Sequence, residues 1–334
     1  MLQHIQGGFM TRVPSTFNMH SPGRQTKYIT LSPVTRTSAF VPETTTDNSY
    51  LISKFSDVCN PSDDANETLA LITVFTAGDH FEHRFTVRKT WGSVVNKMAG
   101  FRLLFLLGRP QSGVVQRRIV QEDKLHGDVV QGTFLDTYQN LTYKSLMMLH
   151  WTKRYCPEAE FVLKVDDDVL LNVWDLAVTL NHLSEDKTRL RIWGTLWTAS
   201  RPSRSASGRY RKWYVPRSVY PNATYPDYLN GPAYLMSGAA LSLLEENSRY
   251  VPYFFIEDVY VTGLVADRAG VERIDDKGFL PDRKHDIRPC RKPRVVASHG
   301  WNPRVLRLAW KRMLRRIDWQ RCMSLGLRTW QKGI

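Results

Sequence analysis

The chain has 334 residues, 42% of them apolar and 11% aromatic, and a formal net charge of +14. This is the composition of a globular protein with an ordinary core. It offers neither a nucleic-acid-binding motif to accompany the positive charge nor a run of the roughly 18–20 apolar residues that a membrane helix needs. The charge is concentrated in residues 283–334, which carry 15 Lys and Arg against two Asp and Glu.

The first half of the chain predicts a flexible lead followed by alternating strands and helices. Residues 1–65 are rich in Ser, Thr and Pro and lack sustained periodicity, so we expect a flexible stem before a folded domain over residues 66–334. The apolar patterns then predict strands at Leu69–Phe75, Phe101–Leu107 (closed by Gly108), Asp128–Gln131 and Phe161–Val165, and helices at His80–Trp91 and Asn140–Tyr155. This alternation predicts an α/β fold with a mostly parallel central sheet.

The second half of the chain is richer in loops. Residues 198–230 contain many Arg, Ser, Tyr and Pro, which favours an irregular lobe that faces an acceptor substrate. A short helix is expected at Gly238–Glu246, and a second helix pattern follows the aromatic and acidic run 254–260 and continues to about Ala269. Leu306, Trp310, Met313, Leu314 and Ile317 recur at helical spacing between basic residues, so we expect a basic, amphipathic C-terminal helix that packs on the domain.

The strand pattern at Phe161–Val165 runs directly into Asp166, Asp167 and Asp168. Three adjacent carboxylates repel one another unless a cation gathers them. Oxygen ligands at the end of a strand suit Mg²⁺ or Mn²⁺. The alternative is a solvated acidic turn before a helix that Asn172 caps.

The four cysteines show no spacing typical of a zinc site. Three glycosylation tripeptides begin at Asn66, Asn140 and Asn222. In an oxidising compartment, one or two disulfides could form.

The chain resembles the β-1,3-galactosyltransferase family, which also includes β-1,3-N-acetylglucosaminyltransferases and is related to the fringe enzymes. Six motifs carry the resemblance in chain order: Arg84 with 88–92 (RKTWG), 105–108 (FLLG), 136–144 (DTYQNLTYK), 164–168 (KVDDD), 225–228 (YPDY) with Gly231, Tyr234 and Ser237, and 257–260 (EDVY) with Gly263. The match spans about residues 68–300. It implies a GT-A fold that uses a UDP-sugar and Mn²⁺ and inverts the anomeric centre.

The function implied by the resemblance is transfer of a hexose, galactose in the first place, to a glycan acceptor on protein or lipid in β-1,3 linkage. A β-1,3-N-acetylglucosaminyltransferase and an inactive UDP- or glycan-binding protein are the alternatives. A phosphohydrolase fits less well, because Leu170 stands where that chemistry usually has Thr or Val. The resemblance also implies a Golgi type II membrane protein, so we expect an anchor helix upstream of the stem, in the lumenal setting that the three tripeptides fit.

Roles for the acidic residues follow from the resemblance and from alternation. Side chains of an extended segment alternate in direction, so Asp166 and Asp168 share a side and Asp167 points away, although all three belong to the expected donor-binding motif. Asp168 is expected to ligate the metal together with His299, and Asp166 to hold donor sugar, ribose or a metal-bound water. Asp258 is expected to be the base that deprotonates the acceptor hydroxyl, with neighbouring Glu257 as the alternative.

Further donor contacts are expected from Arg84, Arg88 and Trp91. The two arginines could bind uridine or phosphate, or could be surface charge on a helix, and Trp91 could instead be core. For Lys144, a phosphate contact and a structural ion pair both stay open. The sequence departs from many relatives at Leu229, where they have Cys, at Ala233, where they have Gly, and at Thr262, which is one residue more than some of them show.

Overall fold

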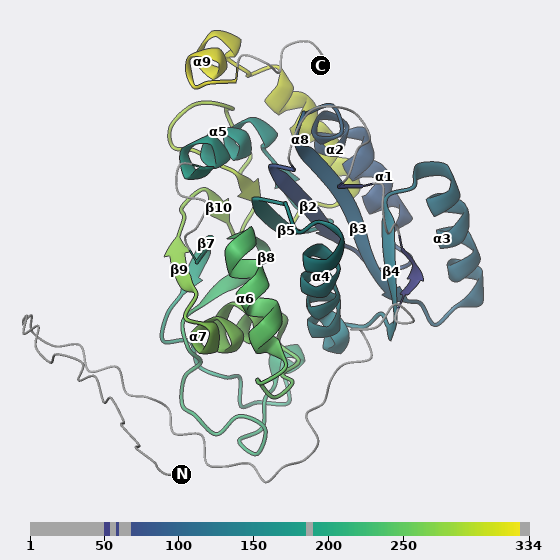
Figure 1. Ribbon diagram of the computed structural model, residues 1–334, viewed down its shortest axis with the longest axis vertical. Helices are drawn as coiled ribbons and strands as arrows, with labels where there is room; N and C mark the ends of the chain where they lie inside the picture. The colour runs from purple at the N-terminus through teal and green to yellow at the C-terminus, as the bar shows by residue number, and fades with distance from the viewer. Residues whose placement is uncertain (1–49, 54–57, 60–67, 185–189, 328–334) are drawn as a thin grey trace, which may run out of the picture. The chain divides into compact units, whose positions relative to one another are not determined.

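The computed structural model describes residues 50–53, 58–59, 68–184 and 190–327 (Figure 1). Its main sheet contains, in chain order, β1 (Tyr50–Ile52), β2 (Ala70–Phe75), β3 (Phe101–Arg109), β4 (Val129–Leu135), β5 (Phe161–Asp166), β7 (Arg191–Trp197), β8 (Tyr228–Ser237) and β9 (Glu272–Asp275). A smaller sheet contains β6 (Leu170–Leu171), β10 (Phe279–Leu280) and β11 (Ala297–Ser298).

The helices lie between these strands. They are α1 (Phe81–Lys89), α2 (Trp91–Val95), α3 (Gly113–His126), α4 (Leu141–Tyr155), α5 (Val173–Leu183), α6 (Gly238–Ser248), α7 (Ala266–Ala269), α8 (Pro303–Leu314), α9 (Trp319–Ser324), the 3₁₀ turns η3 (Tyr138–Asn140) and η5 (Arg211–Trp213), and the π-helix η6 (Val259–Val265). Several begin at a side chain that accepts a hydrogen bond from a free backbone N–H, among them Asn172 before α5 and Ser237 before α6. The expected cap at Asn172 is therefore confirmed.

The order of strands in the main sheet is β1-β4-β3-β2-β5-β8-β7-β9. Strands β4, β3, β2 and β5 pair in parallel, whereas β8 is antiparallel to both β5 and β7. The expected α/β fold with a parallel centre is confirmed. From β2 the chain builds outward to β3 and β4, and then returns through α4 to add β5 on the other side of β2. Because ligands of such sheets bind where the order reverses, we expect the ligand site beyond the carboxyl ends of β2 and β5.

The sheet has a core on each face, because alternate strand residues point in opposite directions. Ile72, Val74 and Leu163 contribute to one core with residues of α1, α2, α5 and α8. Leu71 and Val162 contribute to the other with residues of α4, α6 and η6. Figure 1 shows α4 and α6 side by side on the same face. Both layers fix the position of β5, which carries the acidic motif.

The structure revises several expected boundaries. Tyr50–Ile52, inside the expected stem, pairs with β4 as an edge strand, and Cys59 is joined to Cys156. The folded unit therefore includes residues before position 66, while residues 1–49 lie outside the described residues. Strand β3 continues through Gly108, whose N–H donates to Asp136. The segment that contains Thr262 is π-helical, a form that accommodates one additional residue per turn.

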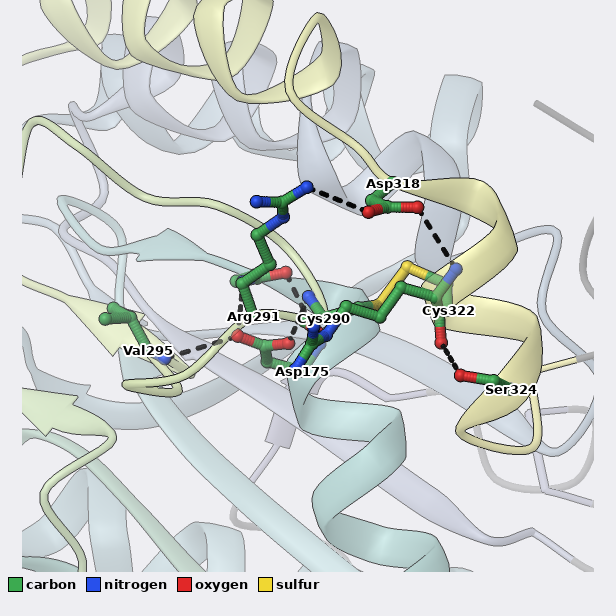
Figure 2. The surroundings of a disulfide bond; sticks show 9 residues. Asp175, Cys290, Arg291, Val295, Asp318, Cys322 and Ser324 are labelled. Atoms are coloured by element: carbon green, nitrogen blue, oxygen red, sulfur yellow. Dashed lines mark hydrogen bonds and ion pairs between the residues drawn. A yellow bond between two sulfur atoms is a disulfide. The ribbon is translucent and has the colours of Figure 1, made fainter.

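A second disulfide ties the C-terminal region to the domain. Cys290 is bonded to Cys322 in α9, and Figure 2 shows Asp175 of α5 beside this bond. The Asp175 carboxylate accepts hydrogen bonds from the backbone N–H groups of Cys290 (2.7 Å) and Val295 (3.2 Å). Burial raises its pKa to about 6, although these N–H groups oppose the shift.

The C-terminal helix α8 has the expected amphipathic character. Leu306, Trp310 and Met313 are buried in the core, while Lys311 and Arg312 are exposed. Ile317 lies beyond the end of the helix. None of the helices in the described part of the chain is long and apolar enough to cross a membrane.

Candidate functional site

The three aspartates at the end of β5 point in two directions, as the alternation of side chains along a strand predicts. Asp166 and Asp168 are each about one-third exposed and lie with His299, and the ligand atoms of the three residues are within 4.8 Å of one another. The smaller sheet produces this proximity. Strand β11 pairs antiparallel with β6, with Ser298 opposite Leu170, so His299 is brought back to the level of Asp168. The Trp301 N–H then donates to the Asp168 carbonyl at 2.9 Å.

The His299 ring is oriented as a metal ligand would be. Its Nδ1 lies 3.0 Å from the Pro281 carbonyl oxygen, and its Nε2 lies 3.2 Å from Asp168 Oδ2. A carbonyl can only accept, so Nδ1 carries a proton. Nε2 faces Asp168: it donates to this carboxylate when the ring is protonated and offers a lone pair to a cation when the ring is neutral. Burial would lower the pKa of His299, but the hydrogen bond and charge of Asp168 raise it overall. Two carboxylates and one imidazole fit a divalent cation such as Mn²⁺.

Lys164 connects the cluster of Asp166, Asp168 and His299 to Gly231, which also contacts Asp258. Its buried ammonium donates to Asp166 Oδ1 (2.6 Å) and to the carbonyl oxygen of Gly231 on the neighbouring strand β8 (2.6 Å). Burial raises the pKa of Asp166 to about 6; the Lys164 charge opposes this shift and the charge of Asp168 adds to it. Lys164 was not among the expected site residues, although a lysine inside an apolar strand, two residues before an aspartate, is a signal that could have identified it.

Asp258 lies at the start of η6 and faces the same part of β8. Its Oδ2 accepts a hydrogen bond from the Gly231 N–H (3.2 Å), and its Oδ1 accepts one from the Val259 N–H (2.9 Å). Gly231 thus contacts Lys164 through its carbonyl and Asp258 through its amide. Burial, followed by the negative charge of Glu257, raises the pKa of Asp258 to about 7. A carboxylate with this pKa can accept a proton near neutral pH.

The adjacent Glu257 has a different environment. It is 7% exposed, and its Oε1 accepts hydrogen bonds from the hydroxyls of Ser145 (2.5 Å) and Tyr234 (2.7 Å). The N-cap of η6 is Asp258, not Glu257. With its carboxylate held by two buried hydroxyls, Glu257 is the less suitable of the pair to receive a proton from a substrate.

Asp167 points away from the other two aspartates. It is buried, and its Oδ2 accepts from the hydroxyl of Thr76 (2.5 Å) and lies 2.8 Å from Nδ1 of His80. His83 stacks on His80, with ring centroids 4.4 Å apart. Asp167 therefore links the end of β5 to the segment between β2 and α1, and its expected direct contact with a donor stays a prediction that this placement does not favour.

The two arginines of α1 are largely buried side chains, exposed neither on the surface nor toward the expected ligand site. The side chain of Arg84 is fully buried, and its guanidinium donates to Glu122 and to the carbonyls of Ala77 and Gly78. Arg88 is 11% exposed and pairs with Glu122 and Asp128. Arg84 consequently fixes the loop that follows β2, next to the expected ligand site. The surface-charge alternative is wrong, and binding of uridine or phosphate would require both arginines to leave these partners.

Trp91 and Lys144 also have structural positions. Trp91 is fully buried, and its indole N–H donates to the Val169 carbonyl at 3.0 Å, so it packs behind the acidic turn and does not stack on a donor. Lys144 is 2% exposed and donates to Asp136 (2.9 Å) and to the Thr76 carbonyl (2.7 Å). Of the two alternatives for Lys144, the structure favours the ion pair.

Comparison with known proteins places these residues in a family context. The galactosyltransferase family model matches residues 82–277. Beta-1,3-galactosyltransferase 5 of Gorilla gorilla gorilla is 34% identical over 257 residues, covering 75% of this chain and 84% of that protein. Lactosylceramide 1,3-N-acetyl-beta-D-glucosaminyltransferase of Rattus norvegicus is 32% identical over 244 residues, covering 71% and 64%. Beta-1,3-galactosyltransferase 1 of Mus musculus is 31% identical over 250 residues, covering 74% of each.

Proposed function

The chain belongs to the galactosyltransferase family and is a glycosyltransferase, and from this premise we propose that it transfers galactose from UDP-galactose to a glycan acceptor in β-1,3 linkage, with inversion at the anomeric carbon. One observation carries the proposal. At the reversal point of the sheet, Lys164 and Gly231 couple the cluster of Asp166, Asp168 and His299 to Asp258. A site for an anionic leaving group and a base of suitable pKa therefore belong to one connected unit.

In the proposed reaction, Asp258 accepts the proton of the acceptor hydroxyl as that oxygen bonds to the anomeric carbon of the donor. Its two backbone N–H partners fix the orientation of the carboxylate, and burial keeps its pKa near neutrality. A methyl group on Gly231 would come within 3.2 Å of Asp258 Oδ2. The glycine therefore leaves room for the Asp258 carboxylate.

Asp168 and His299 would hold Mn²⁺, with Asp166 beside them and neutralised in part by Lys164. When bound, the cation supplies Lewis-acid stabilisation of the diphosphate that leaves. The Pro281 carbonyl keeps the His299 ring in the tautomer that offers Nε2. Arg84 and Trp91 act from behind the site, by fixing the loop after β2 and the turn after β5.

A second candidate donor is UDP-N-acetylglucosamine, because a relative at 32% identity is named for transfer of N-acetylglucosamine. An inactive UDP- or glycan-binding protein is a weaker alternative, since Asp166, Asp168, Asp258 and His299 are all present in one site.

We also place the enzyme in the Golgi lumen, with a membrane anchor upstream of the stem. Two disulfides support an oxidising compartment. Of the two glycosylation tripeptides within the described residues, the one at Asn222 is the better acceptor, because the side-chain amide of Asn140 already donates to the Leu135 carbonyl. A glycan at Asn222 of the native protein, removable by a glycosidase, tests this location; a cytosolic protein without glycan would contradict it.

The catalytic proposal is tested with the purified chain, a panel of UDP-sugars and a panel of glycan acceptors, with Mn²⁺ or with EDTA. We expect acceptor-dependent release of UDP, highest with UDP-galactose, and a β-1,3 linkage in the product by NMR. A higher rate with UDP-N-acetylglucosamine would select the second donor. UDP binding without turnover across the panel would instead support the inactive alternative.

A further inference from the structure

We propose that the acceptor side of the site includes a subsite for an anionic sugar, one that carries a sulfate ester or a carboxylate, formed by the loop between β7 and β8. This inference rests on the proposed function and specifies the class of acceptor. The loop covers residues 198–227, and Figure 1 shows it as long loops at the lower end of the sheet, below α6 and α7. Its regular structure is limited, within the described residues, to η5 and a bridge between Ser203 and Tyr214.

The loop adjoins the base. It leads directly into β8, which reaches Gly231 three residues after Tyr228. The Tyr225 ring lies 5.8 Å from that of Phe254, and Pro226 and Tyr228 lie against Gly263 in η6. These contacts dock the loop on the segment that carries Asp258. A sugar whose hydroxyl reaches Asp258 therefore extends its remaining residues over or beside this loop.

An aromatic surface continues from the base into the loop. Tyr138 in η3 is 37% exposed, and burial together with the negative charge of Asp258 raises its pKa to about 12. The Lys212 ammonium lies 5.5 Å from the Tyr138 ring centroid and 4.2 Å from that of Trp213. Aromatic faces pack against the C–H faces of sugars, and here one such surface has a cation at its edge.

The loop carries mainly positive charge. Residues 198–227 contain one acidic residue, Asp227, next to β8, and six cations: Arg201, Arg204, Arg209, Arg211, Lys212 and Arg217. Arg204 has a structural role, since its guanidinium donates to the carbonyls of Val215, Tyr220 and Asn222. The other five are exposed, and none of them forms an ion pair with a carboxylate in the described part of the chain.

Elsewhere on the protein, many exposed cations are neutralised. Arg191 pairs with Glu272, Arg291 with Asp318, and Arg307 with Glu82. Within the described residues, exposed cations without an ion pair also occur elsewhere, among them Lys311 and Arg312 of α8, so the loop is distinguished by having such charge beside an aromatic surface and next to the segment that carries Asp258. Unpaired charge of one sign attracts a ligand of opposite sign and raises its association rate, an effect that salt screens. A neutral acceptor would gain nothing from it, whereas an acceptor with a sulfate or carboxylate near the reacting hydroxyl would.

The test compares acceptors that share the same terminal hydroxyl and differ in charge: a neutral oligosaccharide, its sulfated form and a form bearing a uronic acid. With the full chain at low salt, we expect kcat/KM to be about tenfold higher for a charged acceptor than for the neutral one, mainly through KM. The advantage should fall toward unity as KCl is raised to about 0.5 M. A gain with sulfate alone, or with carboxylate alone, identifies the group.

Two variants separate this subsite from general surface charge. Lys212→Gln combined with Arg211→Gln should reduce the charged-to-neutral ratio of kcat/KM to near one. The matched control, Lys311→Gln combined with Arg312→Gln on the exposed face of α8, removes the same number of charges and should leave the ratio unchanged. A wild-type ratio of one or below, or equal loss in the control, would overturn the inference while leaving the transferase assignment intact. No transfer to any acceptor from any UDP-sugar would overturn the proposed function and this inference together.

Discussion

Replacement of Asp258 with asparagine tests the base assignment through both rate and stability. The substitution keeps the size of the side chain but removes its ability to accept a proton. We expect transfer to fall by about 10²-fold or more, the usual contribution of general-base catalysis. In the wild-type protein, a pKa of about 7 leaves roughly one-tenth of Asp258 ionised at pH 6, so kcat/KM for the acceptor at saturating donor should be about tenfold below its plateau at pH 8.

The same pKa predicts how stability depends on pH. The folded protein holds the Asp258 proton more tightly than the unfolded chain, whose carboxyl has a pKa of 3.8. Stability from this group is therefore complete below pH 3.8 and is lost as pH rises through about 7. The difference between these two pKa values corresponds to roughly 4 kcal/mol of stability. We take about half of this value because the side chain is partly exposed. Between pH 7 and pH 4, the wild type should gain about 2 kcal/mol relative to Asp258→Asn.

The assays are acceptor-dependent UDP release across pH 5.5–8.5 and urea unfolding across pH 4–8. Protonation of His299 also weakens metal binding at low pH, so Mn²⁺-dependent UDP binding is measured at each pH to separate the two effects. Full transfer activity in Asp258→Asn would refute the reasoning, as would a wild-type profile that is flat from pH 6 to pH 8. If Glu257→Gln is inactive while Asp258→Asn transfers normally, the base is Glu257.

Three further outcomes follow from the site and its supports. Asp168→Ala should abolish Mn²⁺-dependent UDP binding, measured by calorimetry, with little change in Tm; wild-type binding would remove Asp168 from the metal site. Lys164→Met should destabilise the fold by about 2–3 kcal/mol in urea, a low value for a buried ion pair because Asp166 is one-third exposed. The substitution should also raise the pKa of Asp166 and so move the acid limb of the activity profile to higher pH. An unchanged pH profile would contradict the proposed contact between Lys164 and Asp166. Cys322→Ser opens a bond that spans 32 residues and should cost about 4 kcal/mol of stability by chain entropy, while UDP binding at low temperature persists; an unchanged unfolding midpoint would refute this estimate.

Local pattern predicted the elements that carry the site. Alternation along the segment after β5 was enough to put Asp166 and Asp168 on one side and Asp167 on the other. The apolar runs located β2, β3 and β5, and the polar residue before the next helix located its cap at Asn172. These features depend on neighbouring residues in the chain, where the periodicity of a strand or a helix is directly visible.

Long-range pairing could not be predicted in the same way. Arg84 and Arg88 are four residues apart in sequence, but their shared partner Glu122 is in α3 and is reached only after β3 is in place. Likewise, Lys164 and Gly231 meet because β8 inserts antiparallel between β5 and β7. His299 came from family resemblance, since nothing in its local sequence places it opposite Asp168.

The position of the loop between β7 and β8 has a consequence for how such enzymes diversify. The loop joins two neighbouring strands, β7 and β8, that are hydrogen-bonded to each other. Their pairing therefore fixes both ends of the loop, whatever its length or composition. Changes of length or charge in residues 198–227 leave the register of β5 with β2 and β8 untouched. Under the role that we propose for this loop, a lineage that changes residues 198–227 alone can acquire a new acceptor while it keeps the donor site.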